Sequence, residues 1–140
     1  MIALHLSAGE RARILRHARR AKPRECCGLL AGRGDRVVFS AATRNIARGV
    51  SRYQIDPAAH IALRRVLRAF VPPMAIVGVY HSHPRGDARP SPRDVSEAAY
   101  PEWIHLIVGR RGGRPALAAF EIAGGRVREV PIVVDPAGGV

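Results

Sequence analysis

The chain has 140 residues, of which 47% are hydrophobic and 24% are charged. This length and composition fit one globular domain over residues 1–140. Its apolar runs are far shorter than the roughly 20 residues of a membrane-spanning helix, and no basic segment precedes an apolar one at the start of the chain. We therefore expect a cytoplasmic protein with no membrane partner.

The net charge of +12 comes almost entirely from arginine. A strongly basic chain can bind nucleic acid or an acidic protein. Here the arginines are scattered along the chain, and aromatic residues, which would stack on bases, make up only 5% of it. The composition therefore argues against a nucleic-acid partner.

The first part of the chain predicts a helix and a β-hairpin. Ser7 and Glu10 have the spacing of a capping box, and apolar residues at helical spacing follow as far as the break at 22–23. Residues 25–32 become increasingly apolar and predict a strand, which a glycine-containing turn joins to a returning strand at 37–39.

The middle of the chain predicts a polar loop and a second helix. An arginine-rich loop over 42–51 leads into a short strand at 53–55. Asp56 and Pro57 then form an N-cap and first-turn pair, and apolar residues at helical spacing continue to about residue 70.

The remaining elements are mostly strands. A buried strand at 74–79 leads into two histidines, and a short helix begins after Ser91 and ends near Ala99. Further strands are predicted at 103–109, 116–122 and 127–134, the last of them in an antiparallel meander, before a disordered tail at 135–140. Helices interspersed with hairpins and isolated strands indicate an α/β or α+β layered fold with a mixed sheet.

A candidate metal site follows the strand at 74–79. His81 and His83 are two residues apart in a strand, so their imidazoles point to the same face. Asp94 lies in the first turn of the helix that Ser91 and Pro92 begin. Two imidazoles and one carboxylate, with a fourth position left to water, are typical of a catalytic zinc site.

Other interpretations of these residues remain open. A His-x-His pair alone is often a surface feature or a packed pair in the core. Asp87 is a rival ligand, although a glycine-flanked loop holds a carboxylate less firmly than a helix start does. Glu25 has the features of a surface residue beside a turn, and Ser91 those of an ordinary N-cap.

Several other reactive side chains are predicted to be structural. Cys26 and Cys27 are adjacent, which rarely suits a disulfide, so we expect reduced, buried thiols. We expect His17 to be solvated on the first helix, His60 to be structural and His105 to be packed within its strand.

The pattern formed by Glu25, His81-Ser82-His83-Pro84 and Ser91-Pro92-Arg93-Asp94 resembles the JAMM motif of the MPN-domain metalloproteases. In that motif a glutamate precedes His-x-His, and ten residues separate the second histidine from an aspartate. Residues 84–93 are those ten residues, and 23–32 resemble the glutamate strand of the family. The resemblance implies a cytidine-deaminase-like MPN fold, with a mixed, largely antiparallel sheet flanked by helices. A deaminase itself is excluded, because His-x-Glu and Pro-Cys-x-x-Cys are absent from the sequence.

The resemblance also implies roles for the site residues. His81, His83 and Asp94 would hold one Zn²⁺ with a bound water. Glu25 would take the proton of that water and pass it to the leaving amine, and the Ser91 hydroxyl would stabilise the oxyanion.

Members of this family hydrolyse amide or isopeptide bonds, commonly after the diglycine tail of ubiquitin or a ubiquitin-like protein. The length of the chain resembles that of the small prokaryotic members, so the expected substrate is a ubiquitin-like or sulfur-carrier protein with a diglycine tail. The alternatives are a non-catalytic MPN scaffold or binding module, and a zinc peptidase that acts on another small peptide. The terminal Gly138-Gly139-Val140 also raises the question of self-processing, and the sequence leaves a homo-oligomer open.

Overall fold

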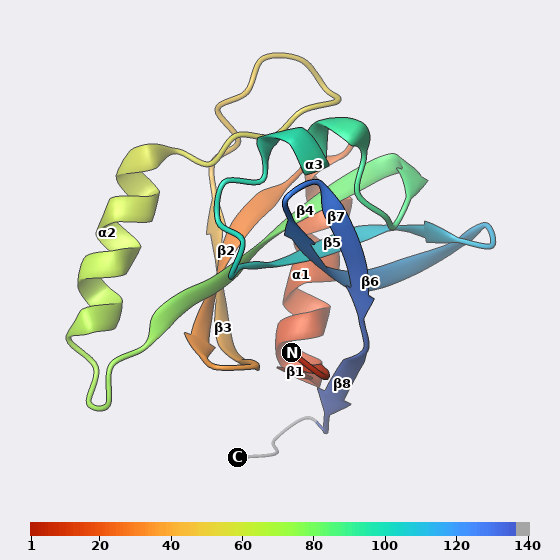
Figure 1. Cartoon of the computed structure of the whole chain (residues 1–140). Coiled ribbons are helices and arrows are strands. Elements are labelled where there is room, and N and C mark those ends of the chain that lie inside the picture. The colour runs from red at the N-terminus through yellow and green to blue at the C-terminus, as the bar shows by residue number, and fades with distance from the viewer. Residues whose placement is uncertain (137–140) are drawn as a thin grey trace.

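The computed structural model describes residues 1–136 as one eight-stranded sheet with three helices (Figure 1). The helices are α1 (Ala8–Ala21), α2 (Pro57–Arg68) and α3 (Pro92–Glu97). The strands, in chain order, are β1 (Leu4–Ser7), β2 (Cys27–Arg33), β3 (Arg36–Thr43), β4 (Ala75–Asp87), β5 (Ile104–Arg111), β6 (Arg114–Ala123), β7 (Arg126–Val130) and β8 (Ile132–Asp135).

The strand order across the sheet is β7-β6-β5-β4-β2-β3-β1-β8. The pairs β2–β3, β2–β4, β5–β6 and β6–β7 are antiparallel, whereas β4–β5, β1–β3 and β1–β8 are parallel. The predicted fold class, a mixed and largely antiparallel sheet flanked by helices, is confirmed. β4 is a central strand, so the histidines that it carries lie in the middle of the sheet.

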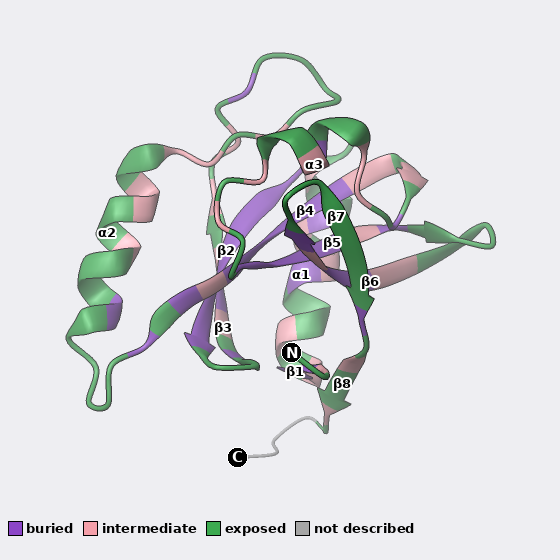
Figure 2. Cartoon of the chain, viewed as in Figure 1, coloured by how far each residue is buried: buried purple, intermediate pink, exposed green. Residues whose placement is uncertain are grey.

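The helices cover opposite faces of the sheet. Ile14 and Ala18 of α1 pack on one face against β-strand residues such as Leu30 and Tyr80. On the other face, α2 contributes Leu67 to a second cluster, and α3 packs against a third cluster around Ile107 and Phe120. Figure 2 shows the buried residues concentrated along the central strands, between these two layers of helices.

The cap residues of the three helices agree with the sequence. Ser7, Asp56 and Ser91 are the N-caps, and each side chain accepts a hydrogen bond from a backbone N–H of the first turn. At α1 the capping box is incomplete. The Glu10 carboxylate accepts hydrogen bonds from the backbone and hydroxyl of Ser40 on β3, so Glu10 ties the helix to the sheet instead.

The ends of the chain differ most from the sequence prediction. β1 was not predicted, and the strand expected at 127–134 is two strands separated at Pro131. β8 leaves the meander and pairs in parallel with β1. Asp135, assigned to the disordered tail, is the last residue of β8 and forms an ion pair with Arg36 at 2.8 Å. Residues 137–140, which include the Gly-Gly-Val tail, lie outside the described residues.

His17 also differs from its prediction. It is half-buried, and its Nδ1 lies 2.7 Å from the hydroxyl of Tyr80, a strand residue that is only 1% exposed. Burial lowers the pKa of His17. This histidine therefore provides the buried phenol of Tyr80 with a hydrogen-bond partner.

Within residues 1–136, no helix has both the length and the apolar character needed to cross a membrane.

Candidate active site

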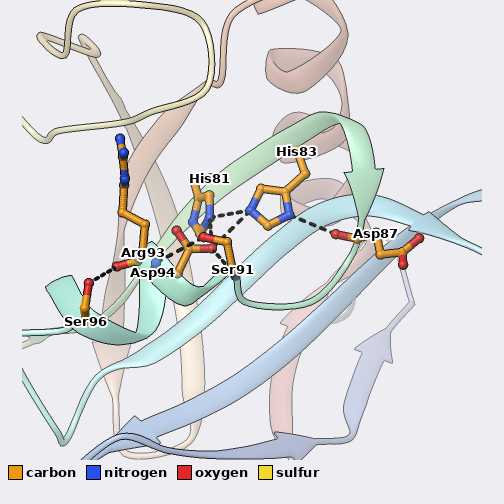
Figure 3. A network of polar contacts seen from close by, with 7 residues as sticks. All are labelled: His81, His83, Asp87, Ser91, Arg93, Asp94 and Ser96. Atoms are coloured by element: carbon orange, nitrogen blue, oxygen red, sulfur yellow. Dashed lines mark hydrogen bonds and ion pairs between the residues drawn. The ribbon is translucent and has the colours of Figure 1, made fainter.

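His81 and His83 lie on the same face of β4, as their spacing predicts (Figure 3). The strand does not stop before the histidines but continues through them to Asp87. His81 is fully buried, whereas His83 lies nearer the surface. Because both residues belong to a central strand, the backbone between them is held by its neighbours rather than by a loop.

Asp94 reaches the two histidines from the start of α3. It occupies the third position of the helix, where the Ser91 side chain accepts from its backbone N–H at 3.1 Å. The Ser91 backbone N–H donates in return to Asp94 Oδ2 at 2.8 Å. This reciprocal capping box orients the carboxylate of Asp94, which is 8% exposed, toward β4.

Three donor atoms converge at this point. His81 Nε2 lies 3.1 Å from His83 Nε2, and Asp94 Oδ2 lies 3.2 Å and 3.1 Å from the two nitrogens. His83 Nδ1 lies 2.8 Å from the Asp87 carbonyl oxygen, which can only accept a hydrogen bond, so Nδ1 carries the proton and a neutral His83 presents a lone pair at Nε2.

The donor set fits a zinc ion. Ligands at about 2.0–2.1 Å from a tetrahedral zinc would be about 3.3 Å apart, close to the spacing observed here. Lone pairs that face one another at such distances repel each other unless a cation or a proton lies between them. The predicted rival, Asp87, contributes its backbone carbonyl to His83, and its carboxylate points away from the two imidazoles (Figure 3). The geometry thus favours Asp94 over Asp87.

The electrostatics of Asp94 and His81 agree with this arrangement. Burial would raise the pKa of Asp94, but the adjacent His81 and His83 rings hold that pKa well below its usual range. Burial lowers the pKa of His81. An ionised carboxylate beside a neutral His81 is the protonation state that metal binding requires. Burial lowers the pKa of His83, but its hydrogen bonds to Asp94 and to the Asp87 backbone raise that pKa above its usual value, so a metal ion there would compete with a proton.

Glu25 lies close to the trio but comes from a different part of the chain. It precedes β2, whose first residue Cys27 pairs with His81 in the antiparallel ladder. The Ser82 backbone N–H donates to the Cys26 carbonyl at 3.2 Å, and the Cys26 N–H donates to Ser82 Oγ at 2.9 Å. If the register is continued by one residue beyond the Cys26–Ser82 contact, Glu25 lies opposite His83. Ser82 therefore points away from the site, and its hydroxyl holds the backbone of Cys26, the neighbour of Glu25.

The Glu25 carboxyl is held in an environment that changes its acidity. The residue is 9% exposed. Burial raises its pKa to about 7, while His83 and Arg93 lower it and Asp94 raises it further. The Asn45 side chain donates to the Glu25 carbonyl at 2.9 Å and so holds this part of the backbone. A carboxyl with a pKa near neutrality can both take up and release a proton.

Ser91 lies beside Glu25 and His83 in a cavity of about 570 Å³. Its Oγ accepts from the Asp94 N–H, which leaves the hydroxyl hydrogen free to donate. The same cavity is lined by residues 84–86, which continue β4 past the point where β2 begins. The structure therefore brings all five predicted site residues to one place, while their roles stay predictions.

One residue of this site was missed by the sequence. Tyr53 stacks on His81 and also lines a narrow extension of the site beside Glu25, Ser91 and Asp94. It forms no local motif with the histidines. It reaches them because the loop that carries it is closed by an isolated bridge between Asn45 and Ile55.

The pattern that defines the prokaryotic homologues of the JAB domain matches residues 7–123. The chain belongs to this family. Among curated relatives of this JAB-domain protein, the desampylase of Haloferax volcanii is 33% identical over 94% of this chain and 96% of its own length. The CysO-cysteine peptidase of Mycobacterium tuberculosis is 34% identical over 86% of this chain and 84% of its own.

Solved structures give the same result for the fold. A protein of Desulfitobacterium hafniense is 30% identical, with a TM-score of 0.84 over 95% of this chain and 93% of that one. A JAB1/MPN domain protein of Archaeoglobus fulgidus, 22% identical, shares the fold with a TM-score of 0.57 over 94% and 97% of the two chains. The predicted JAMM/MPN family and enzyme class, a peptidase of the JAMM type, are confirmed by these relatives.

Proposed function

We propose that this JAB-domain protein is a zinc-dependent hydrolase that cleaves an amide bond after the C-terminal diglycine of a ubiquitin-like or sulfur-carrier protein. The observation that carries the proposal is the convergence of Glu25, Ser91 and the three-donor trio on one cleft. The names of the curated relatives, a desampylase and a CysO-cysteine peptidase, support a protein conjugate as the substrate class. We further propose that residues 1–140 act as one domain in the cytoplasm.

The trio His81, His83 and Asp94 would hold one zinc ion. A zinc ion held there would lower the pKa of a coordinated water to near neutrality. The chain's own contribution is to keep the two imidazoles and the carboxylate in place before any metal arrives. The capping box at α3 and the Asp87 carbonyl perform this task.

Glu25 acts as the general base and then as the general acid. Its carboxylate takes a proton from the attacking water as the bond between the water oxygen and the scissile carbon forms. When the carbon–nitrogen bond breaks, Glu25 returns that proton to the leaving amine. A pKa of about 7 suits both transfers, because neither protonation state is strongly disfavoured at neutral pH.

Ser91 donates its free hydroxyl hydrogen to the oxyanion that develops on the scissile carbonyl. One such donor contributes on the order of 10²–10³ in rate. We place the substrate tail beside β4, because this strand continues through residues 84–86, beyond its contacts with Cys26 and Cys27. An extended diglycine tail can hydrogen-bond to the backbone of this segment.

The test is cleavage of a small carrier protein whose diglycine tail is fused to a reporter peptide. We expect the zinc-loaded protein to release the reporter, with mass spectrometry locating the cut after the second glycine. The Glu25→Gln variant should bind zinc without cleaving. If the wild type holds zinc and cuts other peptides equally well, the diglycine specificity is wrong. If it holds zinc and cuts nothing, the protein is a binding module.

A further inference from the structure

Asn45 is the only asparagine of the chain, and it lies in the arginine-rich loop between β3 and α2. Its side chain forms four hydrogen bonds, all of them to backbone groups. Nδ2 donates to the carbonyl oxygens of Glu25 and Arg52, both at 2.9 Å. Oδ1 accepts from the N–H groups of Ala47 at 3.0 Å and Gln54 at 3.1 Å. One side chain therefore joins three separate stretches of backbone.

These four partners use the full hydrogen-bonding capacity of a side-chain amide. The amide nitrogen has two hydrogens to donate, and the amide oxygen has two lone pairs. Carbonyl oxygens only accept and backbone N–H groups only donate, so the contacts fix which way the amide is turned. A shorter side chain would not reach all four groups, and an aspartate could not donate to the two carbonyls. Asparagine is therefore matched to this position in both length and chemistry.

Glu25 and Asn45 lie just past the end of the antiparallel pair β2–β3. Cys27 pairs with Thr43 at that end of the ladder. Two further steps along both chains lead to Glu25 and Asn45. The Asn45 side chain thus supplies a hydrogen bond to Glu25 where the backbone ladder has ended. The backbone of the proposed base is supported on this side by a single side chain.

The hydrogen bonds of Asn45 also close a loop that reaches the catalytic cleft. The contact from the Ala47 N–H is an Asx turn that starts the loop, and the contact to the Arg52 carbonyl ends it. Val50 and Ser51, between these points, line the cleft of about 570 Å³. Arg24 Nη2 donates to the Ala47 carbonyl at 2.7 Å, so the loop is tied a second time to the segment that carries the proposed base.

The same side chain connects two residues of the candidate site. It holds the Glu25 carbonyl directly. It also holds the residues immediately before and after Tyr53, whose ring stacks on His81 with ring centroids 4.2 Å apart. Loss of the Asn45 amide would therefore affect the proposed base and a proposed metal ligand together.

We infer that Asn45 is a positioning residue of the candidate active site, which acts through Glu25 and Tyr53 rather than by touching the substrate. Its effects on zinc affinity and on cleavage rest on the proposed function, whereas its hydrogen bonds can be measured without metal or substrate. Removal of a residue that orients such groups typically changes metal affinity or activity by about 10–100-fold. A displacement of the base by roughly 1 Å is enough for an effect of that size on the rate.

The hydrogen bonds can be observed directly in the metal-free protein. Because the chain has a single asparagine, selective isotope labelling of asparagine gives one pair of side-chain amide signals in an NMR spectrum. Each amide hydrogen donates to a carbonyl, so we expect both to exchange with water on the order of tenfold more slowly than in free asparagine. Exchange at the rate of free asparagine would overturn the inference at its first step.

Two substitutions test the positioning role. Asn45→Ala removes all four contacts. Asn45→Ser keeps an oxygen that can accept from the Ala47 N–H and so preserve the turn, but it is too short to support the Glu25 carbonyl as well. We expect both variants to lose about 10–100-fold in zinc affinity and in kcat at saturating zinc. The serine variant carries the test if the alanine variant does not fold. Unchanged zinc affinity and kcat in a folded variant would contradict the inference.

Arg33→Ala is the matched control. Arg33 is the last residue of β2, at the opposite end of the strand from Glu25. Its side chain also donates to backbone carbonyls of a loop, those of Pro72 and Pro73. We expect this substitution to change thermal stability without changing zinc affinity or kcat. A loss in Arg33→Ala equal to that in the Asn45 variants would overturn the inference, because it would reduce the Asn45 effect to general loosening of the fold.

Double-mutant cycles show whether Asn45 acts through the two residues named. In a Tyr53→Leu background, Asn45→Ala should cause little further loss of zinc affinity. In a Glu25→Gln background, it should lower the residual rate much less than it does in the wild type. Additive losses in both cycles would overturn the inference. If the wild type binds zinc but cleaves no diglycine substrate, the proposed function fails, while the zinc cycle still decides whether Asn45 acts through Tyr53.

Discussion

The phenol ring of Tyr53 lies flat against the imidazole of His81, with ring centroids 4.2 Å apart and planes inclined by 18°. His81 Nδ1 has no hydrogen-bond partner within the described part of the chain. Metal-binding histidines are usually oriented by a hydrogen bond at the second ring nitrogen. We expect the stacked tyrosine to orient the His81 ring instead.

This relationship predicts that Tyr53→Leu weakens zinc binding. Loss of a group that orients a ligand typically costs 10–100-fold in metal affinity, so we expect an effect of about that size. Tyr53→Phe keeps the ring and should bind zinc as the wild type does. Competition with a chromophoric chelator measures both affinities. Equal affinities for Tyr53→Leu and the wild type would mean that the stack does not position His81.

The metal content of substituted proteins distinguishes the proposed metal ligands from the proposed general base. We expect the purified wild type to hold about one zinc per chain and His83→Ala to lose it, because only two donors remain. Glu25→Gln should keep the metal, since Glu25 is not one of the converging donors. Elemental analysis of the three proteins checks this. A His83→Ala protein that is folded and still holds a full equivalent of zinc would contradict the assignment.

We expect removal of the proposed base to lower the rate of cleavage with little loss of substrate binding. Glu25→Gln preserves the shape of the side chain but cannot accept a proton. We expect kcat to fall by about 10²–10⁴ with KM nearly unchanged. Steady-state kinetics on a diglycine fusion measure this, with Glu10→Gln on α1 as a control that removes a partly buried carboxylate outside the cleft. Equal effects of the two substitutions would point to a general loss of stability.

The pH dependence follows from the same carboxyl group. Burial raises the pKa of Glu25 to about 7, and the base must be ionised to act. The value of kcat/KM should therefore fall as the pH drops through this range and level off above it. A bound cation nearby favours the carboxylate, so the midpoint in the zinc enzyme should lie at or below about 7. An acidic limb centred clearly above this value would assign it to another group.

Ser91 is expected to affect both stability and rate. Ser91→Ala removes a helix N-cap, which costs about 1 kcal/mol, and also the oxyanion donor, which is worth on the order of 10²–10³ in kcat. Ser7→Ala is the matched control, because Ser7 caps α1 with the same 3.1 Å hydrogen bond from the residue three positions on. Thermal unfolding and kcat, measured on both variants, separate the effects. Similar losses of kcat would leave Ser91 with a capping role alone.

The closeness of His81, His83 and Asp94 could be predicted from the sequence, because much of their geometry is local. The period of a strand sets the relation between His81 and His83, and the first turn of a capped helix sets the orientation of Asp94. Glu25 could be assigned to the site only through the family resemblance. Its burial depends on the β2–β4 register and on Asn45 from a distant loop. No local pattern distinguishes Glu25 from a surface glutamate.

The missed features are all non-local. Tyr53 reaches His81 through a loop closed by a bridge between Asn45 and Ile55, and the Glu10 carboxylate accepts hydrogen bonds from Ser40 of β3 instead of completing the capping box of its own helix. The short β1 has too few residues to show a period. Its pairing with β8 depends on contacts between the two ends of the chain, which a pattern of neighbouring residues cannot encode.

The parallel pairing of β1 with β8 places Leu4–Ser7 beside Ile132–Asp135 at one edge of the sheet. Residues close to both ends of the described part of the chain therefore lie side by side, three strands away from β4, which carries His81 and His83. A short linker could join them, and new ends could be opened at the exposed turn around Gly112 and Gly113, between β5 and β6. A circularly permuted enzyme made in this way would keep every residue of the catalytic cleft in its present surroundings.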